Sequence, residues 1–149
     1  MRSDRLRTVS QPVNHAASPR LAGRAGDGMR RPMTTHSGSC HCGAVAFTVE
    51  GDIPSAMECN CSHCSRKGFL LHFVSRDAFR LKTPDAPLTE YLFNRHAIAH
   101  QFCPSCGVQG FAYGKDPKSG ADMVAINVRC LEDVDLAAIP RVAVDGKSF

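Results

Sequence analysis

The sequence predicts a mainly β protein, with antiparallel sheets in a single domain whose strands are held together by bound metal. Short apolar segments recur along the chain between Gly and Pro residues, which is typical of strands joined by turns. The chain has 149 residues, 43% of them hydrophobic, which suits one domain with a modest core. Seven of its eight cysteines fall into three tight clusters, each beside a predicted strand. Metal ions at these strand ends would add the stability that a small core lacks.

The first predicted strand begins near residue 45. Val45, Phe47 and Val49 alternate with Ala, Thr and Glu, which is the period-two pattern of a half-buried strand. Residues 51–54, Gly-Asp-Ile-Pro, end this strand because Gly and Pro favour a turn. Apolar runs or alternation predict further strands at residues 69–74, 88–93, 97–102 and 124–128.

One short helical turn is expected after the last strand, at residues 133–139. Asp133 or Asp135 would cap its start, and Pro140 follows its end. No internal repeat of fixed period interrupts this series of strands. Exposed strand edges leave a homo-oligomer open as an expectation.

The first 32 residues differ in composition from the rest of the chain. They hold seven arginines against Asp4 and Asp27, a net charge of +5, whereas the remainder has 11 basic and 12 acidic side chains, a net charge of −1. We expect residues 1–32 to be a disordered Arg-rich extension of a domain at residues 33–149. A transit peptide and a basic tail for anionic partners remain alternatives. The near-neutral domain has no clustered basic stripe, so no nucleic-acid partner is expected.

The cysteine content favours metal ligands over disulfides. Eight cysteines in 149 residues lie below the roughly 8–10% typical of a disulfide scaffold. We find neither a secretory apolar segment nor an apolar run long enough to cross a bilayer. The prediction is therefore a cytoplasmic protein without membrane contact, in which paired cysteines bind metal or act in catalysis.

Two cysteine pairs have the spacing of structural zinc ligands. Residues 103–107, Cys-Pro-Ser-Cys-Gly, form a zinc-knuckle signature, in which a tight loop allows Cys103 and Cys106 to bind the same ion. Cys40 and Cys42 supply two further thiolates on a tighter loop. If both pairs shared an ion, that ion would close a long loop and stabilise the domain, although spacing alone does not establish which pairs share a site.

The third cluster packs Cys59, Cys61 and Cys64 into six residues. Three thiolates leave one corner of a tetrahedral ion for water, for an incoming thiol or for a histidine. The candidate fourth ligands are His63, His41, His72 and His100. The last cysteine, Cys130, stands among Val and Leu residues, which favours a small buried hydrophobe over a reactive thiol.

Three segments, SGSCHCGAVAFTVEG, CNCSHCSRKG and FCPSCGVQGF, resemble the glutathione-dependent formaldehyde-activating enzymes over about residues 37–131. The resemblance implies two zinc ions on a Gfa/Mss-like fold of coiled antiparallel β-sheets. It assigns Cys40, Cys42, Cys103 and Cys106 to a structural zinc. It assigns Cys59, Cys61 and Cys64 to a second, open zinc associated with glutathione. Residues 65–71 and 91–94 differ from the central enzymes and suggest a sub-branch.

The implied activity is that of a carbon–sulfur lyase that forms S-hydroxymethylglutathione, so a small thiol and an aldehyde are the expected partners. Arg66 and Lys67 follow the open cluster and are candidates for binding the carboxylates of glutathione. His63 and His100 are candidates for moving the proton. Two alternatives remain: a non-catalytic zinc module that binds glutathione or a protein, and redox chemistry at Cys130 by analogy with B-type methionine sulfoxide reductases.

Overall fold

The computed structural model describes residues 33–148, so the extension predicted for residues 1–32 lies outside the described residues. The described part consists of two sheets, short 3-10 turns and one short helix. The smaller sheet has the strand order β1 (Thr35–Ser39), β2 (Ala46–Glu50), β5 (Phe79–Leu81). The larger sheet has the order β10 (Arg141–Val144), β3 (Ala56–Cys59), β4 (Leu71–Ser75), β9 (Asp122–Asn127), β8 (Gln109–Lys115), β7 (Ile98–Phe102), β6 (Thr89–Phe93).

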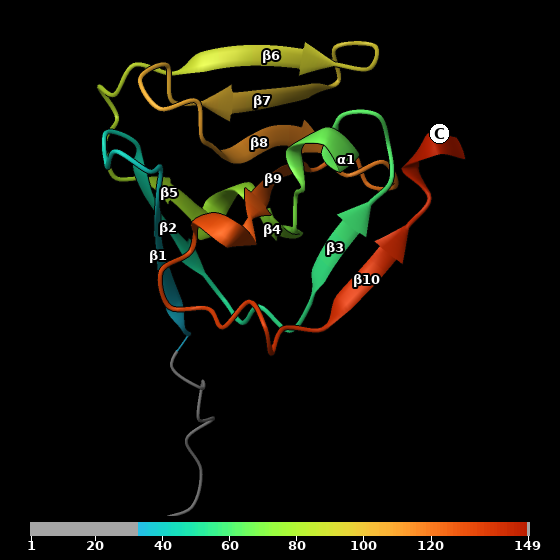
Figure 1. Ribbon diagram of the computed structural model, residues 1–149, viewed down its shortest axis with the longest axis horizontal. Coiled ribbons are helices and arrows are strands. Elements are labelled where there is room, and N and C mark those ends of the chain that lie inside the picture. Colours follow the sequence, from blue (N-terminus) through green and yellow to red (C-terminus); the bar gives the residue numbers. More distant parts are fainter. Residues whose placement is uncertain (1–32, 149) are drawn as a thin grey trace, which may run out of the picture. The chain divides into compact units, whose positions relative to one another are not determined.

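The mainly β, mainly antiparallel prediction is confirmed. The exception is one edge of the larger sheet, where β10 runs parallel to β3 with Arg141 opposite Ala56. Figure 1 shows this pair at one end of the curled sheet and the β6–β7 hairpin at the other. The helix α1 (Cys64–Lys67) follows β3, and the 3-10 turns are η1 (Arg76–Ala78), η2 (Val128–Cys130) and η3 (Gly146–Ser148). Within residues 33–148, we find no helix that is long and apolar enough to cross a membrane.

The core lies around three aromatic rings. Phe47 of β2 packs against Phe79 of β5 and Phe111 of β8 with ring centroids 5.6 Å apart in both pairs, and the latter two rings are 4.7 Å apart. Phe47 and Phe111 are 1% exposed. Because these rings come from both sheets, their packing joins the sheets face to face.

Five of the strands coincide with segments predicted from apolar patterns, namely β2, β4, β6, β7 and β9. Two boundaries were wrong: Phe69 and Leu70 are a buried connection ahead of β4, and Val128 begins η2. The strands β1, β3, β5, β8 and β10 were not predicted. β1 reads Thr-His-Ser-Gly-Ser, so its inward-facing positions carry no large apolar side chain that a periodicity argument would detect.

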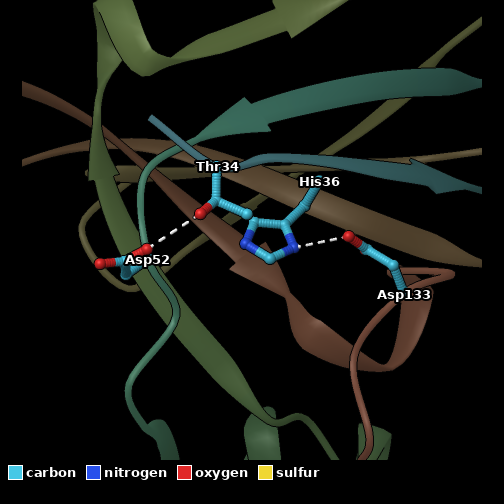
Figure 2. A network of polar contacts seen from close by, with 4 residues as sticks. All are labelled: Thr34, His36, Asp52 and Asp133. Atoms are coloured by element: carbon cyan, nitrogen blue, oxygen red, sulfur yellow. Dashed lines mark hydrogen bonds and ion pairs between the residues drawn. The ribbon is translucent and has the colours of Figure 1, made fainter. Parts of the chain in front are cut away.

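The segment at residues 133–139 forms a turn and no helix. Asp135 caps it, since its Oδ1 accepts a hydrogen bond from the Ala137 amide at 2.9 Å. Asp133 has another role: its Oδ2 lies 2.9 Å from Nδ1 of His36, a residue of β1 that is 9% exposed. Figure 2 shows this contact beside the hydrogen bond from Thr34 to Asp52. The His36–Asp133 pair therefore fastens the segment after β9 to β1.

Candidate metal centres

The structure brings two distant cysteine pairs into one group. Cys40 and Cys42 lie on the turn after β1, Cys103 and Cys106 lie on the turn after β7, and all four Sγ atoms are within 4.8 Å of one another. The sulfur of Cys42 is 3.6 Å from the sulfurs of both Cys40 and Cys103. A tetrahedral zinc ion with Zn–S distances of about 2.3 Å places its sulfurs about 3.8 Å apart. The donor set and its spacing therefore fit a zinc-sized ion.

Local backbone geometry builds both turns of this four-cysteine group. Gly43 and Gly107 have φ values of 78° and 73°, a left-handed conformation that glycine adopts without steric cost. This conformation lets the Val45 amide donate to Cys40 Sγ at 3.3 Å, and the Gly107 amide donates to the carbonyl of Cys103 at 2.8 Å. Amide donors around sulfur stabilise the thiolate form that a metal requires.

Two thiols of this four-cysteine group, those of Cys42 and Cys106, have pKa values that shift in opposite directions. The Val108 and Cys42 amides lower the pKa of Cys106 to about 6. The Ala44 amide lowers the pKa of Cys42, but hydrogen bonds with Cys103 and Cys40 outweigh it and raise that pKa to about 11. The group thus does not lose all its protons near neutral pH by itself. A dication held by the four thiolates would supply the missing positive charge.

The second group contains three cysteines. Cys59 ends β3, Cys61 lies on the following turn, and Cys64 begins α1, with all three Sγ atoms within 4.8 Å of one another. Among residues 33–148, no histidine, aspartate or glutamate joins this group at that distance. The Cys61 amide donates to Cys59 Sγ and the Cys64 amide donates to Cys61 Sγ, both at 3.4 Å. A tetrahedral ion held here would keep one open position.

Two thiols of the three-cysteine group, those of Cys61 and Cys64, have pKa values that shift in opposite directions. Burial raises the pKa of Cys64, and hydrogen bonding and charge from Cys61 add to the effect. Burial also acts to raise the pKa of Cys61, but hydrogen bonds from the Cys64 amide and side chain outweigh it, so the pKa is lowered overall. Cys61 therefore ionises before Cys64, which needs a positive neighbour to become a thiolate.

A cavity of about 610 Å³ adjoins the three-cysteine group. Cys59 and Cys64 line it, with Ser65 and Phe69 from α1 and the segment after it, and Val144 and Asp145 on the side of β10. The three-cysteine group thus lies beside a space large enough for a small organic molecule.

The structure places His63 and His100 side by side, although neither joins the three-cysteine group or lines the cavity. Their ring centroids are 4.2 Å apart, and Phe69, Tyr91 and Phe93 surround His63 at 5.3–5.7 Å. Burial lowers the pKa of both rings, that of His100 to about 4. Within residues 33–148, the buried Nε2 atoms of both rings have no hydrogen-bond partner. Both rings are neutral at neutral pH, so each carries one ring proton.

The other predicted site residues lie away from the cavity. Arg66 donates to the carbonyl of Ser62 at 2.6 Å, and Lys67 lies 5.9 Å from the ring centroid of Phe102. Neither lines the cavity. His72 contacts the Ser55 carbonyl at 3.1 Å.

His41 and Cys130 lie by the other metal group. Both line a smaller cavity of about 370 Å³ with Cys40, so His41 is remote from the three-cysteine group. Cys130 is half-buried, and its thiol contacts the Gln109 carbonyl at 3.8 Å. Burial raises the pKa of Cys130 to about 11, which describes a thiol that stays protonated and weakly reactive.

Three further residues contribute to the three-cysteine group, and sequence reasoning missed them. Asn60, between two of the cysteines, donates to Asp145 Oδ1 at 2.7 Å, and Gly146 lies against Cys59. The chain separates Asn60 from Asp145 by 85 residues. The only sequence signal was the position of Asn60 inside the cluster, because no pattern links residues so far apart.

Two comparisons bear on this arrangement. The sequence matches the family model described as glutathione-dependent formaldehyde-activating enzyme over residues 35–144. A crystal structure of a Rhodobacter sphaeroides protein, solved as a structural-genomics target, is similar with a TM-score of 0.59 and 29% sequence identity. That match covers 71% of this chain and 99% of the other.

Proposed function

Because this chain belongs to the family of glutathione-dependent formaldehyde-activating enzymes, we propose that it joins the thiol of glutathione to formaldehyde and forms S-hydroxymethylglutathione. It would act as a carbon–sulfur lyase working in the adduct-forming direction, in the cytoplasm. The new C–S bond forms as the carbonyl π bond opens, and the thiol proton ends on the new hydroxyl group. The reaction balances without an oxidant or a reductant.

The observation that carries this proposal is the three-cysteine group, which offers one ligand fewer than a tetrahedral ion takes and lies beside a cavity. We propose zinc at this group and a second, structural zinc at the four-cysteine group. A zinc ion bound at the open group would promote deprotonation of an incoming thiol, whose free pKa is about 8.5. Cys59, Cys61 and Cys64 would hold that ion. The cavity would keep the thiol and a small aldehyde close together.

The proton transfer is proposed for His63 and His100. Both rings are neutral at neutral pH because burial lowers their pKa values, so each has one ring nitrogen without a proton. The Phe69 ring lines the cavity and stacks 6.3 Å from that of His100, so the pair lies behind the cavity wall. The histidines would exchange protons with the cavity rather than touch the reacting carbon.

Arg66 and Lys67 remain the proposed partners for the carboxylates of glutathione. Both are exposed on α1, directly after Cys64. They lie outside the cavity lining, so a tripeptide held by them would extend from the cavity over α1 to the protein surface. Arginine suits such an exposed carboxylate because it binds in a bidentate manner.

The proposal is tested by glutathione-dependent consumption of formaldehyde, with bound zinc measured on the same samples. Cys61→Ser should retain the structural zinc, lose the second ion and lower the enzyme-dependent rate by at least about 100-fold. Cys130→Ala is the matched control, because its thiol belongs to neither metal group, and should keep both ions and the rate.

Equal rates for the wild type and Cys61→Ser, or no acceleration over the spontaneous reaction, would contradict catalysis. X-ray absorption showing four protein ligands at both ions would instead support the non-catalytic zinc module. Loss of a sulfoxide-reducing activity in Cys130→Ala alone would support the redox alternative.

A further inference from the structure

The backbone of residues 145–148, here called the 145–148 turn, lies directly against the three-cysteine group. A Cβ atom placed on Gly146 would overlap Cys59 Sγ and would lie 3.2 Å from Cys61 Cβ. The φ angle of Gly146 is not positive, so its backbone conformation does not itself require glycine. The absence of a side chain is therefore needed for the close approach to Cys59.

Asn60 fastens this turn from inside the three-cysteine segment. The Asn60 amide donates to the Val144 carbonyl at 3.1 Å, and its side-chain Nδ2 donates to Asp145 Oδ1 at 2.7 Å. Its Oδ1 in turn accepts from the Lys147 amide at 3.0 Å. One side chain between Cys59 and Cys61 thus satisfies groups on both sides of Gly146.

The turn continues a wall of the cavity. Ala143, Val144 and Asp145 line the cavity together with Ser65 and Phe69 of the α1 segment. Figure 1 shows the end of β10 and the turn after it beside β3. Both the cysteine group and the cavity are therefore bounded by residues more than 80 positions away in the sequence.

We propose that the 145–148 turn is the outer wall of the three-cysteine site, and that Asn60 and Gly146 are the residues that position it. This wall holds Cys59 in place for metal binding and limits access of other ligands to the ion. The match to the family model ends at residue 144, so the turn lies beyond the matched region. The inference rests on the proposed metal binding at the three cysteines but not on the proposed reaction with formaldehyde.

The hydrogen bonds between Asn60 and the turn resemble those that hold metal ligands in place in known metal sites. Groups that orient a ligand without touching the ion change metal affinity by about 10–100-fold when they are removed. Asn60→Ala removes both side-chain bonds to the turn, whereas Gly146→Ala forces the turn or Cys59 to move. Both changes leave all seven cysteine ligands in the chain.

The test measures the affinity of each metal group for Zn²⁺ by competition with a chromophoric chelator, with Co²⁺ absorption as a second readout. Asn60→Ala and Gly146→Ala should weaken Zn²⁺ binding at the three-cysteine group by about 10–100-fold. Binding at the four-cysteine group should not change. Gly114→Ala is the matched control, because its new Cβ would meet atoms only at 3.9–4.0 Å. This control should bind both ions as the wild type does.

Affinities within twofold of the wild type in both variants would overturn the inference, as would equal weakening of both sites. The outcome is separable from the proposed function. Absence of formaldehyde chemistry together with a selective loss of affinity leaves the inference standing. Normal activity and normal affinity in both variants would refute the inference alone.

Discussion

At the scale of single residues, burial determines what the histidines do. His100 is 4% exposed, and its Nδ1 pairs with the Gln109 amide while its Nε2 has no partner in the part of the chain that the structure describes. Burial lowers the pKa of His100 to about 4, and the nearby His63 and Lys67 contribute in the same direction. A charged imidazolium in this position would lose hydration without gaining an acidic partner.

We predict that His100 makes the folded state less stable at acidic pH. The unfolded chain takes up a proton near pH 6.5, but the folded chain does so only near pH 4, so stability is lost as the pH falls between these values. The loss amounts to about 2 kcal/mol by pH 5 and at most about 3 kcal/mol below pH 4. Urea unfolding at pH 7.5 and pH 5.0 measures it.

His100→Gln is the control for this prediction. Any metal that acid releases would be lost from both proteins alike, so the difference between their pH dependences isolates His100. An NMR titration giving His100 a pKa near 6.5, or identical pH dependences in the two proteins, would contradict the prediction.

At the scale of elements, glycines at two strands make room for the central ring of Phe47. A Cβ on Gly38 of β1 would lie 2.6 Å from the Phe47 ring, and one on Gly110 of β8 would lie 2.8 Å from it. The ring is also flanked by Phe79 and Phe111, which leaves it little room to move. These two glycines serve close packing of the sheets rather than a special backbone conformation.

Gly110→Ala should therefore destabilise the protein by about 1–3 kcal/mol, the usual cost of overpacking a core. Chemical denaturation with bound zinc measures this change in unfolding free energy. Gly114→Ala, on the same strand but with only ordinary van der Waals contacts at its Cβ position, should change it by less than about 1 kcal/mol. Equal effects of the two substitutions would show that Phe47 does not limit the space at Gly110.

At the scale of the whole molecule, the four cysteines of one group come from turns of both sheets. Cys42 and Cys103 are 61 residues apart, and the turns that carry them belong to β1–β2 and β7–β8. The three-cysteine group joins only neighbouring residues to one another. The two groups thus differ in how much chain each one constrains.

Loss of the two ions should accordingly have unequal effects on stability. Loop-closure entropy for about 60 residues gives about 4 kcal/mol to a cross-link at the four-cysteine group. We expect Cys103→Ser to lower the melting temperature strongly, and Cys61→Ser to leave it within a few degrees of the wild type. Calorimetry with metal analysis measures both. A larger loss of stability from Cys61→Ser would contradict this division.

Much of the fold and the local clustering of the cysteines were predictable from the sequence. Strands such as β2 and β9 carry alternating apolar residues, which local sequence reveals. β1 and β8 escaped prediction because glycines occupy positions where a ring from another strand fills the space. Asp133 was expected as a helix cap, but it pairs with His36 across 97 residues, a contact that no local pattern encodes.

The sequence by itself determined the family, the mainly β class and the division of seven cysteines into three clusters, because cysteines spaced a few residues apart lie on one short loop. Only the tertiary structure decided that the two pairs meet in one group, that no histidine among residues 33–148 completes the other, and that Gly146 lies against Cys59. These depend on chain segments 60–90 residues apart, whose meeting is set by packing and sheet register across the whole domain.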